Sequence, residues 1–255
     1  YFKKFSEEPL TELYLGKYSL KKNEKIDEFI YTVSKKFKSS ILPVLPSWLN
    51  DKLRKLSDTE TKEFYNSILG QGKLDIRVNS MNYKREQVLK LLHNANIEAL
   101  PTSVSPVGIT IQKKIPQHKL KKIKLDYFEV QDEGSQIMSF LSGVEPHMKV
   151  LDYCAGKGTK TLALYSLMYG KGEIFAFEKD DRRSLHLKKR FKELKLDKIK
   201  ILEKTEGYKN YFDLVLIDVP CSGSGTWRRR PEDLLRLKKV DYDNLLKVQI
   251  EILNK

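Results

Sequence analysis

The segment from Asp218 to Arg230 holds the residues best suited to chemistry: a carboxylate, a cysteine and three consecutive arginines. The apolar, β-branched run 212–217 precedes it and predicts a strand buried on both faces, as in parallel sheets. Asp218 is therefore expected at the carboxyl end of a strand, where open α/β sheets bind ligands. Pro220 has no amide hydrogen with which to continue the strand, so Cys221 is expected on a loop.

Two roles are open to Cys221. A cysteine that follows a buried strand often serves as a small core residue. The three arginines in the same segment favour a reactive role, because nearby cations stabilise a thiolate. We therefore interpret Cys221 as a functional residue.

A second chemical pattern is a glycine-containing turn between a predicted strand, 149–152, and a predicted helix that runs to residue 169. Such a turn lets the backbone approach a ligand, and the helix N-terminus offers free amides. Glu178 ends the next predicted strand, at the spacing where a ribose-binding acid is expected. The residues that we assign to this cofactor site are Asp152, Cys154, Ala155, Gly156, Lys157, Gly158, Thr159, Lys160, Glu178 and Asp218.

Two cofactors, NAD and S-adenosylmethionine, suit a site of this kind. The dinucleotide fingerprint has a third glycine where this chain has Thr161, which disfavours NAD. Asp152, directly before the turn, suits a cofactor with an amine or a cationic centre. S-adenosylmethionine has both, and it is the cofactor that we predict.

The elements that must position these residues alternate between strand and helix. Further strand candidates at 200–202 and 214–217 extend the pattern to a doubly wound α/β sheet. Upstream, strand 74–79, helix 83–93 and strand 107–111 predict a compact α+β module, which we interpret as ferredoxin-like. Residues 129–136 have the composition of a capped helix start.

Three domains are expected from these patterns. Helical spacing interrupted by prolines predicts a small helical region at 1–70. The α+β module spans 71–127 and is interpreted as RNA-binding, and the catalytic α/β domain spans 128–255.

The charge of the chain favours an anionic partner. Its 48 Lys and Arg residues exceed its 34 Asp and Glu residues and leave a net charge of +14, which favours nucleic acid. A genome-wide excess of lysine would produce the same charge, so the charge does not establish RNA binding by itself. The lysine-rich stretch 113–124 predicts a basic loop, and the residues that we expect to contact RNA phosphates are Arg77, Asn79, Arg228, Arg229 and Arg230.

The cysteine count and the hydropathy exclude several classes. Cys154 and Cys221 are the only cysteines, and no Cys/His cluster indicates a metal site or a disulfide framework. No apolar run reaches the length of a membrane span, and no signal-peptide pattern opens the chain. We expect a cytoplasmic monomer without a metal or a membrane partner. Because the chain lacks an initial Met and ends within a helical pattern, we also expect a fragment of a longer protein.

Four stretches carry a resemblance to a known family: 77–79, 128–136, 152–161 and 218–229. Over roughly residues 45–255 the chain resembles the RNA cytosine-5 methyltransferases of the RsmB/Nop/Sun type. The resemblance implies a class I, Rossmann-like methyltransferase fold with S-adenosylmethionine bound along 154–160. It also implies that Glu178 binds the ribose hydroxyls, that Asp218 lies near the methionine end or the target base, and that the substrate is ribosomal RNA.

The resemblance further implies covalent catalysis. In the family a thiolate adds to carbon 6 of cytosine, which makes carbon 5 nucleophilic enough to accept a methyl group. The cysteine matched by Cys221 helps to release the product. The implied catalytic residues are Cys221, Asp218 and Lys160, with Lys160 assisting proton movement or orienting the base.

Three departures from the family pattern keep other functions open. The family loop Ala-Pro-Gly-Gly-Lys-Thr corresponds here to residues 156–161, where Gly156, Lys157, Gly158 and Thr159 take its first four positions and only Gly158 keeps the family residue. Residues 203–206 do not match the family's adenine contact, and the family's nucleophile lies in a Thr-Cys-Ser motif that this sequence does not contain. A DNA cytosine-5 methyltransferase with Cys221 as nucleophile, and an RNA-binding assembly factor without catalysis, are the alternatives. Amino-methylating enzymes need an aromatic residue where Cys221 stands, which disfavours them.

Overall fold

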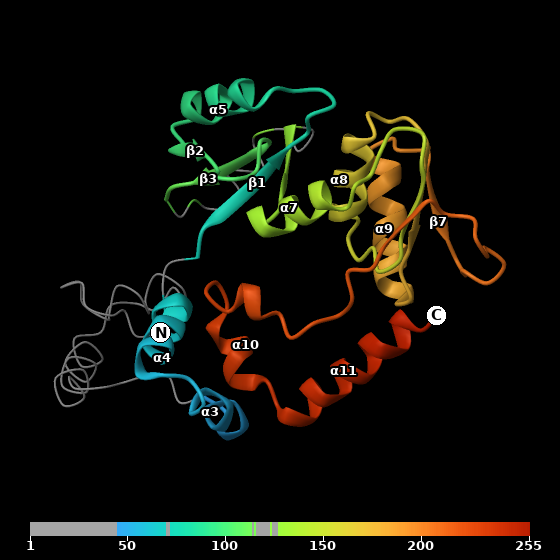
Figure 1. The fold of residues 1–255 in the computed structure, drawn as a ribbon. Helices are drawn as coiled ribbons and strands as arrows, with labels where there is room; N and C mark the ends of the chain where they lie inside the picture. The colour runs from blue at the N-terminus through green and yellow to red at the C-terminus, as the bar shows by residue number, and fades with distance from the viewer. Residues whose placement is uncertain (1–44, 70–71, 114, 116–122, 124–126) are drawn as a thin grey trace. The chain divides into compact units, whose positions relative to one another are not determined.

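The computed structural model describes residues 45–69, 72–113, 115, 123 and 127–255 (Figure 1). The chain forms two compact units, one of residues 73–220 and one that combines residues up to 72 with 221–255. The helical patterns expected within residues 1–44 lie outside the described residues, as does most of the lysine-rich stretch 113–124.

The first half of unit 73–220 is an antiparallel sheet with the strand order β2-β3-β1-β4. Its strands are β1 (Leu74–Val78), β2 (Ala99–Pro101), β3 (Gly108–Ile111) and β4 (Phe128–Val130). Because side chains alternate along a strand, Ile76 and Val78 share one face and pack with Val88 and Leu92 of helix α5 (Arg85–Asn94). The predicted strands 74–79 and 107–111 and helix 83–93 are confirmed.

A layer of buried polar residues occupies the opposite face of this sheet. Asp75 and Arg77 are buried there, between β1 and helix α7 (Glu133–Leu141). Asp75 accepts a hydrogen bond from the Thr110 hydroxyl at 2.7 Å and another from the Glu133 amide at 3.2 Å. Buried polar groups need such partners, so this layer fixes the position of α7 on the sheet.

The stretch 128–136, which carries part of the family resemblance, forms the interface between the antiparallel sheet and α7. Its first residues form β4, which pairs with β1 in the register Val78↔Phe128 and Arg77↔Glu129, although the sequence placed residue 128 at the start of the catalytic domain. Asp132 then caps α7 by accepting a hydrogen bond from the Gly134 amide at 3.2 Å, which confirms the capped helix start. Two of the stretches that resemble the family are therefore neighbouring strands.

The second half of this unit is a parallel sheet with the order β7-β6-β5-β8. Its strands are β5 (Lys149–Asp152), β6 (Glu173–Phe177), β7 (Ile199–Leu202) and β8 (Leu214–Leu216), and its helices are α8 (Thr159–Leu167) and α9 (Asp181–Glu193). Central strand β6 is buried on both faces: Ile174 and Ala176 pack with residues of α8 and α9, and Phe175 packs against the rings of Tyr208, Tyr211 and Phe212. The predicted alternation of strand and helix is confirmed.

Strand β8 is less buried than the sequence predicted. Run 212–217 was expected to be covered on both faces, yet Val215 is 44% exposed and Ile217 is 37% exposed. The reason is position: among the described strands β8 pairs with β5 alone and is an edge strand of the sheet. An apolar run therefore indicated the strand but not its place in the sheet.

The other unit is helical. It contains α3 (Ser47–Leu53), α4 (Asp58–Leu69), the 3₁₀ turn η2 (Ser224–Thr226), α10 (Pro231–Arg236) and α11 (Lys239–Leu253). Its core joins residues from both ends of the chain, namely Leu45, Leu53, Tyr65, Ile68, Trp227 and Leu234. The Trp48 indole also donates to the Leu237 carbonyl at 3.2 Å. The segment after Pro220, which the sequence assigned to the catalytic domain, thus packs on the helices of residues 45–69.

We predict that Gly108→Ala destabilises the antiparallel half of unit 73–220. An added Cβ would lie 2.2 Å from Thr102 Oγ1 and 2.8 Å from Gln136 Oε1, both of which are buried. Overpacking of this kind reduces the free energy of unfolding by about 1–3 kcal/mol. Denaturant unfolding with an unchanged m-value would measure the loss.

Gly134→Ala is the matched control for this measurement. Gly134 lies in α7, and the nearest atom to an added Cβ is Asp132 Oδ1 at 3.6 Å, an ordinary contact. Alanine in a helix is stabilising by up to about 1 kcal/mol relative to glycine. Equal stability of the two variants would contradict the packing argument.

Candidate active site

The carboxyl ends of three neighbouring parallel strands bring three acidic residues to one edge of the sheet. Asp152 is the last residue of β5, Glu178 follows β6, and Asp218 lies two residues after β8. The register pairs Asp152 with Ala176 on one side and with Leu216 on the other. Central strand β5 therefore places Asp152 between the strands that carry the other two acids.

The loop between β5 and α8 is held against both neighbouring strands. The Tyr153 amide donates to the Leu216 carbonyl at 2.9 Å, and the Ala155 amide donates to the Phe177 carbonyl at 3.0 Å. Gly158 then adopts a left-handed φ of 78°, and a Cβ there would lie 2.5 Å from the Phe191 ring. Glycine is required at this position for both conformation and space.

Asp152 is fully buried, and only one of its two carboxylate oxygens has a hydrogen-bond partner among the described atoms. The Thr161 hydroxyl donates to its Oδ2 at 2.6 Å, whereas its Oδ1 has no hydrogen-bond partner among the described atoms. The pKa of Asp152 is raised to about 6, mainly by burial; the Thr161 hydrogen bond opposes this increase and the Asp218 charge adds to it. A buried acceptor without a donor is suited to a donor group from a ligand.

Glu178 organises the loop in addition to facing the site. Its Oε2 accepts the Gly156 amide at 2.9 Å, and its Oε1 accepts the Asp180 amide at 3.0 Å. Each carboxylate oxygen has a second lone pair, so both retain the capacity to accept hydroxyl groups. Glu178 thus fixes the glycine loop while remaining a competent ribose ligand.

Lys160 and Asp218 form an ion pair. Lys160 lies in the first turn of α8 with a side chain that is 19% exposed, and the Asp218 side chain is 53% exposed. Two of the three predicted catalytic residues are therefore brought together, beside the predicted cofactor residues. Their pairing keeps a cation next to the acidic edge.

Cys154 is unsuited to nucleophilic attack at neutral pH. Its side chain is half-buried, and its pKa is raised to about 11, mainly by burial and also by the charges of Glu178, Asp152 and Asp218. The nucleophile is the thiolate, and a thiol with this pKa is almost entirely protonated at pH 7. Cys154 is accordingly a loop residue surrounded by acids.

Cys221 belongs to the helical unit, whereas all the predicted cofactor residues lie in unit 73–220. It is exposed, and the nearby Trp227 anchors its loop by packing in the helical core. Arg228, Arg229 and Arg230 are exposed, as a phosphate-binding role requires, and Arg230 also pairs with Asp233 at 3.1 Å. The predicted loop position of Cys221 is thus observed.

Arg77 does not lie where the sequence placed it. We expected it to contact RNA phosphates, but it is 4% exposed and its Nε donates to Gln131 Oε1 at 2.6 Å. The cause is the alternation of side chains along β1, which points Arg77, like Asp75, toward α7 instead of solvent. Asn79 follows β1 and begins a turn, since its carbonyl accepts the amides of Asn82 and Tyr83.

Sequence reasoning missed the roles of three residues at the site, namely Thr161, Arg190 and Glu129. Thr161 was used only to disfavour NAD, yet its hydroxyl holds Asp152. Arg190 donates to the Lys157 carbonyl of the glycine loop and forms an ion pair with Glu129 of β4. Because Arg190 lies in a helix rich in basic residues, 61 positions from Glu129, no local pattern distinguishes it.

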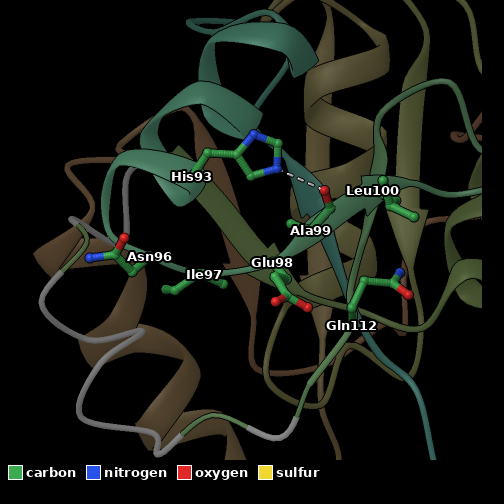
Figure 2. A pocket seen from close by; sticks show the side chains of 7 residues that line it. All are labelled: His93, Asn96, Ile97, Glu98, Ala99, Leu100 and Gln112. Atoms are coloured by element: carbon green, nitrogen blue, oxygen red, sulfur yellow. Dashed lines mark hydrogen bonds between the residues drawn. The ribbon is translucent and has the colours of Figure 1, made fainter.

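A pocket of about 510 Å³ lies elsewhere in unit 73–220, beside α5 and β2 (Figure 2). Figure 2 shows His93, whose Nε2 lies 2.9 Å from the Ala99 carbonyl oxygen, on one side of it. None of the predicted site residues lines this pocket.

Within the described ranges, no group of three or more His, Cys, Asp or Glu residues could hold a metal ion, and no helix has the length and apolar character needed to cross a membrane.

Known families and proteins share this chain's sequence pattern. A family model described as 16S rRNA methyltransferase RsmB/F matches residues 138–255, and a second, the ferredoxin-like domain of RsmF/B-like methyltransferases, matches residues 45–118. The ribosomal RNA small subunit methyltransferase B of Citrobacter koseri is 28% identical over 216 residues, which cover 82% of this chain and 50% of that protein. The chain thus spans about half the length of the curated relatives it matches.

Solved structures share its fold. The crystal structure of PH0851 matches with a TM-score of 0.75 and 24% identity, over 96% of this chain and 58% of that one. NSun6 from Pyrococcus horikoshii, solved with SFG, matches with a TM-score of 0.61 and 16% identity, over 71% of this chain and 72% of that one. These likenesses show the class I methyltransferase fold that the sequence predicted. Since the two family models reach both sheets of unit 73–220, the chain belongs to the RsmB/F family of methyltransferases.

Proposed function

We propose that the protein to which this chain belongs transfers a methyl group from S-adenosylmethionine to carbon 5 of a cytosine in RNA, with ribosomal RNA as the substrate. The observation that carries the proposal is the acidic edge of the parallel sheet, where Asp152 and Glu178 flank a glycine loop and the Lys160–Asp218 ion pair lies beside it. The names of the curated relatives support the choice of ribosomal RNA. A cytoplasmic location and a monomeric state accompany the proposal, and light scattering would test the latter.

The residues present fit S-adenosylmethionine. The buried, unpaired Oδ1 of Asp152 is an acceptor for a cationic amino group, and Glu178 retains lone pairs for ribose hydroxyls. Around Gly156 an added Cβ would meet no atom closer than 4.0 Å, so the loop is open at that point. A structural relative solved with SFG, an analogue of this cofactor, supports the same choice.

The protein's own residues would prepare the base and release it. The cofactor supplies the methyl group, and Lys160, held by Asp218, places a proton donor at the same edge. The family resemblance assigns the attack on carbon 6 to a cysteine of a Thr-Cys-Ser motif. Cys154 does not replace that cysteine because burial keeps it protonated, and Cys221 is assigned to product release.

We expect Glu178→Ala to weaken binding of S-adenosylmethionine. Charge-assisted hydrogen bonds contribute roughly 1.5–3 kcal/mol, so the dissociation constant should rise about 10- to 100-fold. Isothermal titration calorimetry would measure it. Glu173→Ala, which removes a partly exposed acid paired with Lys200 at the start of β6, is the control and should leave the affinity unchanged. Equal affinity of Glu178→Ala and wild type would show that Glu178 does not bind the ribose. A wild-type protein that binds RNA but not the cofactor would support the alternative of an assembly factor without catalysis.

We expect RNA binding to weaken steeply with salt, because phosphate contacts release counterions. The proposed contacts are the exposed Arg228, Arg229 and Arg230 together with the α+β module. Replacing the three arginines by glutamine should reduce the slope of log affinity against log salt concentration by about 2, since each contact to single-stranded RNA contributes roughly 0.7. The triple variant Arg54→Gln/Lys55→Gln/Lys62→Gln, which removes three exposed cations of the same unit, is the charge-matched control. A salt-independent complex would argue against phosphate recognition.

The roles of the cysteines predict opposite outcomes for Cys221→Ala in the full-length protein. If Cys221 releases the product, the variant should still attack the base, and a covalent protein–RNA adduct should accumulate on denaturing gels with a labelled rRNA fragment. If Cys221 is the nucleophile, as in DNA cytosine-5 methyltransferases, the adduct should disappear. Residues 1–255 alone, which contain no Thr-Cys-Ser motif, should neither methylate nor trap RNA. Methylation by this segment would overturn the assignment of roles.

A further inference from the structure

Arg190 connects the glycine loop to the antiparallel sheet. Its guanidinium donates to the Lys157 carbonyl on one side and pairs with the Glu129 carboxylate of β4 on the other. The Arg190 and Glu129 side chains are 26% and 20% exposed, so the pair is largely shielded from solvent. A shielded guanidinium with two acceptors is held more firmly than a surface ion pair, which contributes little.

The carbonyl that Arg190 holds is at the centre of the loop. Lys157 lies between Gly156 and Gly158, both with left-handed φ angles. The peptide group that carries its carbonyl is otherwise held by the Gly158 amide, which donates to the Ala155 carbonyl at 2.7 Å. On one side Glu178 accepts the Gly156 amide, and on the other Gly158 abuts Leu187 and Phe191 of α9. Helix α9, which carries Arg190, therefore supports the loop by packing and by a hydrogen bond.

Glu129 is itself oriented by the antiparallel sheet. It lies opposite the buried Arg77 in the register of β1 and β4. Burial lowers the pKa of Arg77 to about 10 and the Glu129 charge raises it, so the two charges stabilise each other. Glu129 thus stands between two arginines, one in its own sheet and one in α9.

We propose that Arg190 is a positioning residue for the cofactor loop and that Glu129 makes its position depend on the antiparallel sheet. Cofactor affinity is then coupled to the module that we assign to RNA binding. This inference rests on the proposed cofactor site, because it names what sets the shape of that site. The geometry that carries it is the pair of contacts that Arg190 makes with Glu129 and with the Lys157 carbonyl, with Arg77 opposite Glu129 in the sheet.

The first test compares Arg190→Met with Lys188→Met by calorimetric titration of S-adenosylhomocysteine. Loss of a shielded, charge-assisted pair should weaken binding about 10- to 100-fold in Arg190→Met. Lys188 lies on the same helix in an exposed pair with Glu203, and its replacement should change the affinity less than twofold. Arg190→Lys keeps the charge but not the two-pronged guanidinium, and should fall between wild type and Arg190→Met.

Glu129→Gln tests the coupling. Like Arg190→Met, it should weaken binding of S-adenosylhomocysteine. The double variant Glu129→Gln/Arg190→Met should bind no more weakly than Arg190→Met alone, because both changes break the same ion pair. Additive losses would show that Glu129 acts independently and would overturn the coupling. Affinity within twofold of wild type in Arg190→Met would overturn the positioning role.

A readout without cofactor separates this inference from the proposed function. Amide exchange of residues 153–160 in the ligand-free protein should accelerate in Arg190→Met and not in Lys188→Met, while the amides of β6 stay protected as an internal check of folding. If the wild type does not bind S-adenosylhomocysteine, the proposed function fails, and the exchange comparison still decides the role of Arg190. Unchanged loop exchange would overturn it.

Discussion

Three carboxylates end three neighbouring parallel strands, and the rest of unit 73–220 depends on how their charges are accommodated. Like charges at one sheet edge repel, and burial increases the penalty. The protein uses a different means for each acid: the Thr161 hydroxyl for the buried Asp152, Lys160 for Asp218, and two backbone amides for Glu178. Cys154 lies among all three, and its pKa is raised by each of their charges.

The glycine loop follows from this arrangement. Its amides must turn toward Glu178 while its backbone passes close to α9, and Gly158 meets both demands with a left-handed φ and no side chain. The family's usual loop sequence is altered at three positions here, Gly156, Lys157 and Thr159. The strand ends and α9 nevertheless hold the loop by hydrogen bonds to its backbone, for which side-chain identity matters less. The altered loop is therefore compatible with a formed site.

The antiparallel sheet contributes more than a surface. The buried polar layer under α7 includes Arg77, Gln131 and Glu133, which belong to the stretches 77–79 and 128–136 that resemble the family. Asp75 and Thr110, outside those stretches, complete it. Arg77 and Gln131 are partners within this layer, and Glu129 extends it toward α9. Sequence stretches that suggest ligand binding, here 77–79 and 128–136, can thus serve to connect the antiparallel and parallel halves of unit 73–220.

The sequence by itself determined the local elements and the residues at their ends. Period-two alternation revealed β1 and β3, and apolar runs revealed β5 and β6. The acid that ends β5, the acid that follows β6 and the glycine turn predicted the site, because these features depend on neighbouring residues. Strands β2 and β4 have three residues each, too few to show a period. Tertiary structure alone decided that β8 is an edge strand, that Arg77 is buried, and that Arg190 meets Glu129 and Lys157. Exposure and pairing of a side chain depend on which distant element packs over it, and no local pattern records that partner.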